Sequence, residues 1–341
     1  MNYTHEMHRL QESCKQKGPL CIGLDTDPSY IPESILSNYA HPAEAVLAYN
    51  KALIDATKND TGCYKVQIAY YEAMGLKGLS CYLETLRYLR SLDIPFIADI
   101  KRGDIADTAK AYARAHFSGD FEANTITVNP YMGFDTLEPF LEWCKPKTNN
   151  TNPDAREKTA PTDKSVPLPK GFFVLLRTSN PGMVDIEKQE LASGGFVLDR
   201  VGEKLLSIEK EMASLYANAG LSKTASDHTN VCSPVGAVVG CTEESDARAL
   251  RDAYPNIFFL IPGYGAQGGA ARIAATLLDK AGGTVNSSRG ILTAWKNDSL
   301  LEEKRSAEKL CLKDIVESAQ RAAKNAKEDL LSAKKSLQIN N

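Results

Sequence analysis

The chain has 341 residues, 43% of them hydrophobic, and a formal net charge of −3. This allows a large buried core, and the lack of a basic excess argues against a nucleic-acid partner. Residues 1–17 are polar, without the apolar segment of a signal peptide, and no apolar run is long enough to cross a bilayer. We therefore expect a cytoplasmic protein that does not bind a membrane. None of the eight cysteines forms a C-x-x-C pair, so zinc-ligand spacing is absent.

Eight short apolar runs follow one another along the chain, with longer segments of helical pattern between most of them. Nearly continuous apolar runs are typical of parallel strands covered on both faces. The predicted strands are 20–25, 64–68, 94–101, 124–129, 172–177, 235–240, 257–261 and 283–288. The predicted helices are 42–59, 71–91, 104–118, 134–144, 195–219, 243–254 and 267–281.

This alternation predicts an α/β fold of the (β/α)8 TIM-barrel type, with one domain over residues 1–320. A doubly wound open sheet is the alternative, although no G-x-G-x-x-G follows the first strand. Residues 145–170 are rich in Lys, Pro, Thr and Asn, and we interpret them as a solvated insertion. Residues 321–341 are expected to form a charged C-terminal tail that is helical or frayed.

Charged residues end the third predicted strand, where a buried strand normally excludes charge. Asp99 and Lys101 are two positions apart, so their side chains share a face of the strand, and Asp104 follows in the turn. The carboxyl ends of barrel strands carry the active site. A structural ion pair at the barrel rim is the simpler reading, but three charges at this spacing favour a catalytic centre.

Two further charges lie on the neighbouring strands. Asp25 ends the first strand and Lys65 lies within the second. We expect Asp25, Lys65, Asp99 and Lys101 to converge, with alternating signs that stabilise one another. A lysine between carboxylates stays protonated, which makes it a poor base and a ready proton donor.

The last two strands are followed by segments suited to binding phosphate. Residues 262–269 (PGYGAQGG) follow the seventh strand and residues 287–290 (SSRG) the eighth. Loops at these positions of a barrel often bind phosphate through backbone N–H groups, which glycine lets approach closely. Arg289 adds a guanidinium that matches phosphate geometry.

Taken together, these segments resemble the orotidine 5′-monophosphate decarboxylase family, in its longer bacterial and protozoal-type subgroup. Residues 99–105 (DIKRGDI) are similar to that family's D-x-K-x-x-D-I signature. The other segments that carry the resemblance are 23–25, 64–67, 128–133, 178–182, 262–269 and 288–290. They run from about residue 18 to residue 295 in the expected order.

The resemblance implies a decarboxylation of orotidine 5′-monophosphate to uridine 5′-monophosphate, the last step of de novo pyrimidine nucleotide synthesis. Lys101 would deliver a proton to C6 of the pyrimidine, and Asp99 would lie beside the substrate carboxylate. Asp25 and Lys65 would hold ribose hydroxyls. No cofactor and no metal is required if Lys101 both stabilises and protonates the carbanion.

The same resemblance assigns the remaining contacts. Ser179 would read the pyrimidine amide and Pro262 would line the base pocket. Gln267 and Arg289 would hold the 5′-phosphate. A homodimer with shared active sites is also implied, because Asp104, Ile105 and Thr108 would reach into the site of the other subunit.

Two alternatives remain open. A metal-dependent sugar-phosphate decarboxylase or aldolase with a related barrel would need an acidic metal ligand on the second strand, where this chain has Lys65. A non-catalytic barrel that binds pyrimidine nucleotides would keep Gln267 and Arg289 but lose a member of the charged array, and every member is present.

Overall fold

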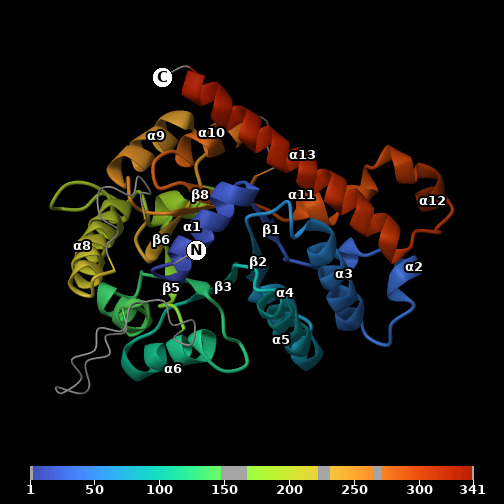
Figure 1. Ribbon diagram of the computed structural model, residues 1–341, viewed down its shortest axis with the longest axis horizontal. Coiled ribbons are helices and arrows are strands. Elements are labelled where there is room, and N and C mark those ends of the chain that lie inside the picture. The colour runs from blue at the N-terminus through green and yellow to red at the C-terminus, as the bar shows by residue number, and fades with distance from the viewer. Residues whose placement is uncertain (1–2, 147–166, 222–230, 265–269, 340–341) are drawn as a thin grey trace.

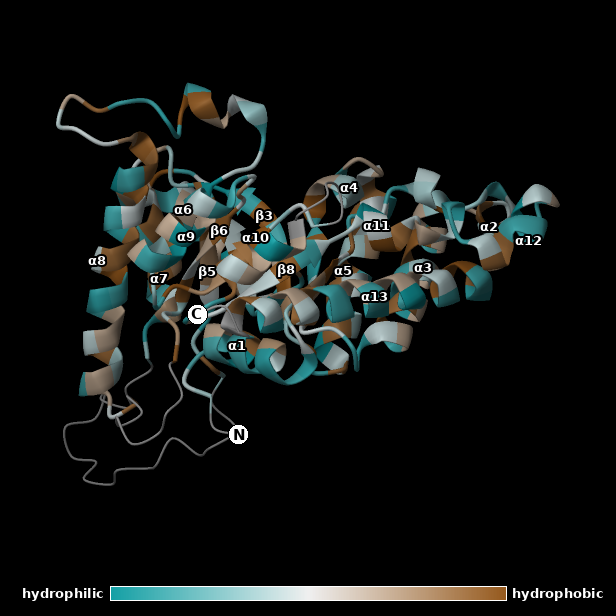
Figure 2. Cartoon of the chain, turned by 90° about the horizontal axis from the view of Figure 1, so that it is seen from above, coloured by the Kyte–Doolittle hydropathy of each residue, from teal (hydrophilic) through white to brown (hydrophobic). Residues whose placement is uncertain are grey.

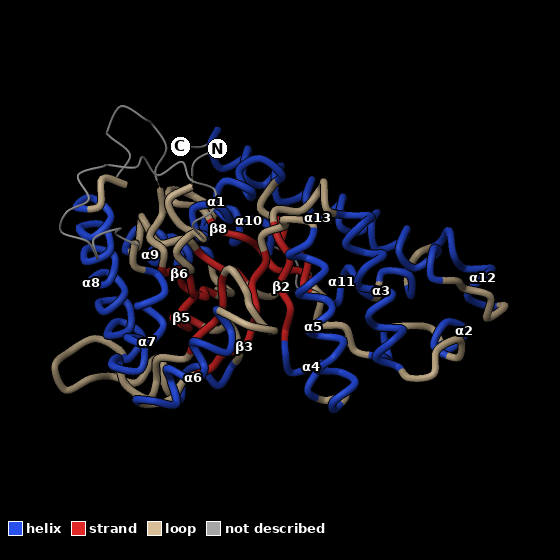
Figure 3. Tube along the Cα trace, turned by 60° about the horizontal axis from the view of Figure 1, so that its bottom comes forward, coloured by secondary structure: helices blue, strands red, loops and turns tan. Residues whose placement is uncertain are grey.

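The computed structural model describes residues 3–146, 167–221, 231–264 and 270–339. Eight parallel strands pair in chain order, and the eighth pairs with the first, so the sheet closes into a barrel. Figure 3 shows the strands as a ring enclosed by helices. The predicted (β/α)8 barrel is confirmed, and closure of the sheet excludes the doubly wound alternative.

Every predicted strand overlaps an observed one. The strands are β1 (Leu20–Gly23), β2 (Cys63–Gln67), β3 (Phe96–Arg102), β4 (Thr125–Val128), β5 (Gly171–Arg177), β6 (Val235–Val239), β7 (Phe259–Ile261) and β8 (Gly283–Ser287). Nearly all of their residues are buried, as expected for strands that face a filled interior on one side and helices on the other.

The longer helices surround this barrel, and Figure 2 shows mixed hydrophobic and hydrophilic residues along each of them. The α-helices are α1 (Glu6–Lys17), α2 (Glu33–Leu36), α3 (Pro42–Thr57), α4 (Ile68–Glu72), α5 (Gly75–Ser91), α6 (Ala106–Phe117), α7 (Glu138–Leu141), α8 (Val197–Asn218), α9 (Glu244–Ala253), α10 (Ala270–Leu277), α11 (Arg289–Leu292), α12 (Glu302–Ser306) and α13 (Leu312–Ile339). The 3₁₀ helices are η1 (Pro28–Tyr30), η2 (Phe134–Leu137), η3 (Glu142–Cys144), η4 (Pro181–Asp185), η5 (Ala294–Lys296) and η6 (Ser299–Leu301).

Two predicted helices are interrupted. The segment 71–91 breaks before Gly75, which adopts a φ of +67° that few other residues tolerate. The segment 134–144 divides into η2, α7 and η3, because Pro139 has no backbone N–H to donate within a continuous helix.

Helix α1 closes the end of the barrel where the strands begin. Met7, Leu10 and Cys14 pack into the interior with Ile97 and Phe173. The polar side chains of α1 bind the backbone just before the strands: Gln11 donates to Ala281 O at 2.8 Å and Ser13 to Gly62 O at 2.6 Å. The opposite end, where the strands finish, is therefore the end that can admit a ligand.

The N-cap of α1 makes stability depend on pH. His5 accepts a hydrogen bond from the His8 N–H at 3.0 Å and is 2% exposed. Burial, with the neighbouring His8, lowers the pKa of His5 from 6.5 to about 3. Because the unfolded chain takes up this proton near pH 6.5 and the folded chain does not, stability present above that pH is lost as the pH falls toward 3. At about 1.4 kcal/mol for each pH unit between the two values, the loss amounts to several kcal/mol.

We expect the free energy of unfolding in urea to fall between pH 6.5 and pH 4, and to fall less steeply in His5→Asn, because asparagine caps a helix without taking up a proton. The control is His41→Asn, since His41 caps α3 but is partly exposed. Equal pH slopes for wild type and His5→Asn would contradict this account.

The C-terminal part of the chain takes the place of the eighth barrel helix. Helix α13 packs between α10 and α3 and against β1, crossing one side of the barrel in Figure 1. Residues 321–339 of the segment expected as a tail lie within this helix, where Leu330 is fully buried. At the far end of α3, η1 and α2 lie beside the segment before α13, and Ser34 Oγ donates to Leu310 O at 2.9 Å.

Most of the insertion expected at 145–170 lies outside the described residues, since only 145–146 and 167–170 are described. Within the described ranges, no helix is both long and apolar enough to span a membrane.

Candidate active site

Four charged side chains form a chain of alternating sign where β1, β2 and β3 end. Lys65 Nζ lies 2.7 Å from Asp25 Oδ1 and 3.3 Å from Asp99 Oδ2. Lys101 Nζ lies 2.6 Å from Asp99 Oδ1. The four residues that the sequence predicted to converge therefore meet in one array, which carries no net charge.

Asp99 is buried and lies at the centre of the array, between Lys65 and Lys101. Its carboxylate also accepts hydrogen bonds from Thr127 Oγ1 and Gln67 Nε2, both at 2.8 Å. Burial alone would raise the pKa of Asp99, but the charges of Lys65 and Lys101, with the hydrogen bonds from Lys101 and Thr127, lower it to about 2. Asp99 therefore stays ionised at neutral pH.

Lys65 is buried with its ammonium between two carboxylates. Burial lowers the pKa of Lys65, and the charges of Asp25 and Asp99 raise it by more, so the net pKa lies above the usual value. A permanent cation occupies the position where a second-strand metal ligand would be needed. Among the described residues, no three His, Cys, Asp or Glu side chains are grouped so that they could hold a metal ion.

Lys101 reaches Asp99 from an irregular part of β3. Ala98 pairs with Ile126 and Arg102 with Val128, so four residue steps of β3 lie opposite two of β4. Lys101 itself has a φ of +46°, in the sparsely populated left-handed region. Its N–H donates to Thr127 Oγ1 at 3.0 Å. Regular strand alternation, the basis of the prediction, is thus not what brings Lys101 to Asp99; a bulge fixed by Thr127 does so.

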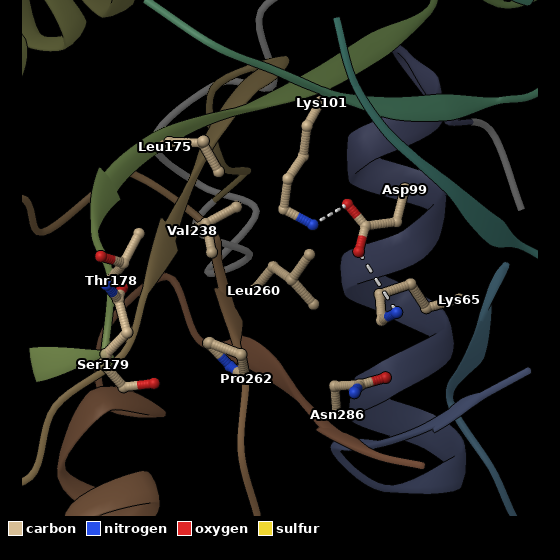
Figure 4. Close-up of a pocket in the computed structure, with 11 residues that line it drawn as sticks. Lys65, Asp99, Lys101, Leu175, Thr178, Ser179, Val238, Leu260, Pro262 and Asn286 are labelled. Carbon is tan, nitrogen blue, oxygen red and sulfur yellow. Dashed lines mark hydrogen bonds and ion pairs between the residues drawn. The ribbon is translucent and has the colours of Figure 1, made fainter. Parts of the chain in front are cut away.

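A cavity of about 250 Å³ opens beside the array. Figure 4 shows Lys101, Asp99 and Lys65 on one side and Thr178, Ser179 and Pro262 on the other. The remaining lining residues are Leu175, Asn180, Val238, Leu260 and Asn286. A ligand here would have an apolar surface on one side and a row of charges on the other, as a flat ring with polar substituents requires.

Asp25 is held in place from β8. Ser288 Oγ donates to Asp25 Oδ2 at 2.8 Å and accepts from Asn286 Nδ2 at 3.1 Å. Gly23 is required beside them, because a Cβ there would lie 2.0 Å from Ser288 Oγ. Ser288 belongs to the predicted phosphate-binding segment 287–290, but its hydrogen bond to Asp25 was not predicted.

The other expected site residues are spread around the rim. Arg289 begins α11, next to Ser288, and is exposed. Asp104, Ile105 and Thr108 follow β3 and do not line the cavity of their own chain; Ile105 and Thr108 are exposed. Gln267 lies outside the described residues.

The sequence interpretation missed several residues of the site. Thr127 and Gln67 fix Asp99, and Asn286 and Thr178 line the cavity. A usable signal was present for two of them, because Gln67 is two positions after Lys65 on one strand and Thr127 is a polar residue in an apolar run. Thr178 begins the motif 178–182, of which only Ser179 was given a role, and nothing local in the sequence marks Asn286.

Comparison with known proteins agrees with this geometry. Residues 18–302 match the model of the orotidine 5′-phosphate decarboxylase / HUMPS family. The chain belongs to this family. An orotidine 5′-phosphate decarboxylase of Clostridium botulinum (strain Loch Maree) is 44% identical over 309 residues, which cover 90% of this chain and 95% of the relative. That of Clostridium acetobutylicum is 46% identical over 291 residues, with coverage of 85% and 90%.

Solved structures of the orotidine 5′-phosphate decarboxylase family share the fold. The OMP decarboxylase of Leishmania donovani is 26% identical, with a TM-score of 0.62 and coverage of 97% of this chain and 98% of that one. The orotidine 5′-monophosphate decarboxylase of Plasmodium berghei has a TM-score of 0.70 at 16% identity, with coverage of 98% and 100%, and at that identity it speaks for the fold alone. The family resemblance inferred from the motifs is confirmed.

Proposed function

We propose that this chain decarboxylates orotidine 5′-monophosphate to uridine 5′-monophosphate and CO2, the last step of de novo pyrimidine nucleotide synthesis. The observation that carries the proposal is the array in which Lys65 and Lys101 flank Asp99 beside an apolar cavity. The family match and the names of the relatives support the same activity.

The reaction breaks the bond between C6 and the carboxylate and leaves its electron pair at C6. This carbanion is localised and has no electron sink in the ring. The Lys101 ammonium stabilises the developing charge and then donates its proton to C6, becoming a neutral amine. Because the Lys101 side chain is 45% exposed, solvent can restore that proton once product leaves.

The ionised Asp99 has two roles in this proposal. It holds the Lys101 ammonium through the 2.6 Å contact, and it lies where the substrate carboxylate would enter, so that the two negative charges repel until CO2 departs. Asp25 and Lys65 bind ribose hydroxyls, Ser179 contacts the pyrimidine amide and Pro262 packs against the base. All of these groups are supplied by the chain, so the proposal includes no metal and no cofactor.

The array also weighs against the two alternatives. The Lys65 ammonium lies 2.7 Å from Asp25 and 3.3 Å from Asp99. It would therefore repel a divalent cation that these two carboxylates were to bind. A barrel that only binds nucleotides has no need of a buried lysine and aspartate such as Lys65 and Asp99, 3.3 Å apart, since desolvating them is costly.

The proposal is tested by incubating the purified chain with orotidine 5′-monophosphate and following the loss of the orotate chromophore, with uridine 5′-monophosphate identified as product. We expect turnover at nanomolar enzyme. No turnover at micromolar enzyme would contradict the proposal.

Arg289, with Gln267, is proposed to bind the 5′-phosphate. Arg289→Ala should mainly raise KM, because the lost contact lies far from the bond that breaks. Hydrogen bonds to charged groups contribute about 1.5–3 kcal/mol, so KM should rise roughly ten- to a hundredfold. Arg248→Ala is the control, since Arg248 lies on α9 and pairs with Asp279, just after α10. A fall in kcat at unchanged KM would count against the assignment.

We further propose a homodimer in which Asp104, Ile105 and Thr108 act in the site of the other subunit. Ile105, at 54% exposure, follows β3, and Met132, also at 54%, follows the adjacent strand β4, so both supply apolar surface for such an interface. Placing Asp104 in trans accounts for its position outside its own cavity.

The shared site is tested by mixing two inactive variants, Lys101→Ala and Asp104→Ala. A hybrid dimer has one site with both lesions and one with neither, so full subunit exchange should restore about a quarter of wild-type activity. Exchange is verified by mass spectrometry of differently tagged subunits. Proven exchange without recovered activity would rule out a role for Asp104 in trans.

A further inference from the structure

A buried carboxylate that the proposed reaction does not use fastens the segment after β5. Glu187 follows η4 and is 3% exposed. Its two oxygens accept from the Thr178 N–H at 3.1 and 3.0 Å, and Oε1 also accepts from Thr178 Oγ1 at 2.8 Å. Tyr131 OH donates to Oε1 at 3.3 Å.

These contacts close the segment from Thr178 to Glu187 on itself and join it to Tyr131, which is far away in sequence. Tyr131 follows β4, Thr178 follows β5, and Glu187 lies nine residues beyond Thr178. Of these, Thr178 lines the cavity, together with Ser179 and Asn180. Figure 4 shows Thr178 and Ser179 on the side of the cavity opposite Lys65 and Asp99.

Burying the Glu187 carboxylate costs free energy unless all of its hydrogen-bond donors stay in place. Within the described part of the chain, no ion pair includes Glu187, so hydrogen bonds alone compensate the burial of its charge. A buried carboxylate that loses such donors is strongly unfavourable, and its position is therefore tightly coupled to theirs. The Glu187 carboxylate thus fixes the position of the Thr178 backbone more firmly than a hydrogen bond to a neutral acceptor would.

We infer that Glu187 is a positioning residue that sets the base-recognising edge of the cavity, Thr178–Ser179–Asn180, without touching the ligand. The inference rests on the proposed function, in which Ser179 contacts the pyrimidine amide. It adds a residue that determines how well the base is bound. The proposed ribose contacts come from β1 and β2, and the proposed phosphate contacts from the segments after β7 and β8.

Because the base contacts and the ribose and phosphate contacts come from different parts of the barrel, the two can be measured separately. A general loosening of the fold would weaken both. Loss of Glu187 should weaken binding of uridine 5′-monophosphate, which carries the base, but not of ribose 5-phosphate, which lacks it. In Glu187→Ala we expect the Kd for uridine 5′-monophosphate to rise about tenfold, equivalent to about 1.4 kcal/mol. The inhibition constant of ribose 5-phosphate should stay within about twofold.

Two milder variants keep the test open if Glu187→Ala does not fold. Glu187→Gln retains one oxygen that can accept from the Thr178 N–H, and Thr178→Val removes only the hydroxyl donor, so each should show part of the same selective loss. Glu190→Ala is the control, because Glu190 is exposed on the same segment. It should bind both ligands as wild type does.

The outcomes separate this inference from the proposed function. Selective loss of uridine 5′-monophosphate binding, in a wild-type background that turns over orotidine 5′-monophosphate, supports both. Equal loss of both ligands, or loss of neither, in an otherwise active protein overturns the role of Glu187 alone. A wild-type chain without turnover overturns the proposed function and this inference with it.

Discussion

Lys101→Ala should lower kcat by roughly 10⁴-fold, because the substitution removes both the cation that stabilises the carbanion and the proton that quenches it. The fold should survive, since the Lys101 side chain is 45% exposed and Asp99 keeps its contacts with Lys65, Thr127 and Gln67. Uridine 5′-monophosphate should bind with a much smaller loss, because Lys101 acts mainly in the transition state.

Steady-state turnover and product titration on the same preparation measure these two effects. Lys110→Ala is the control, as Lys110 is a neighbouring lysine on α6 that pairs with the exposed Asp107. A Lys101→Ala enzyme with near-normal kcat would remove Lys101 from the mechanism.

Asp99→Asn should have the second-largest effect, on activity and stability together. The side chain keeps its size, but the Lys65 and Lys101 ammonium groups lose the carboxylate that lies 3.3 and 2.6 Å from them. Removing one partner of a buried charge pair typically costs about 3–5 kcal/mol. The pKa of Asp99 is lowered from 3.8 to about 2, so its carboxylate is ionised throughout the neutral range. The part of the stability that is linked to this pKa shift is lost as the pH falls from about 3.8 toward 2.

Urea unfolding at pH 7 measures the stability loss, and kcat is measured where the variant is still folded. We expect kcat to fall by roughly 10²-fold or more, since Lys101 is no longer held at the reacting carbon. Asp107→Asn removes an exposed, paired carboxylate and should change neither quantity appreciably. Wild-type stability and kcat in Asp99→Asn would contradict the proposed array.

The barrel could be predicted from the sequence because its strands have a clear hydrophobic pattern. Parallel strands buried on both faces read as short apolar runs, and all eight runs overlap observed strands. The role of α1 was not predictable, because an amphipathic helix before the first strand does not reveal which end of the barrel it covers. The same holds for α13, whose charged sequence gives little sign that Leu330 is buried.

The charged array was predictable for a similar reason. Asp25, Lys65, Asp99 and Lys101 are exceptions within buried strands, and the carboxyl ends of adjacent strands meet in a barrel. The local geometry was not predictable: the bulge in β3 and the positive φ of Lys101 depend on Thr127, which lies on the next strand. Glu187 depends on partners 9 and 56 residues away in sequence, which no local pattern connects.

Turnover of orotidine 5′-monophosphate after metal has been removed with EDTA tests the central claim most directly, because it asks whether the lysine–aspartate array suffices for the chemistry. We expect decarboxylation at the same rate with and without EDTA, and its loss in Lys101→Ala. Absence of turnover by the wild-type chain, or activity that EDTA abolishes and a divalent metal restores, would contradict the account.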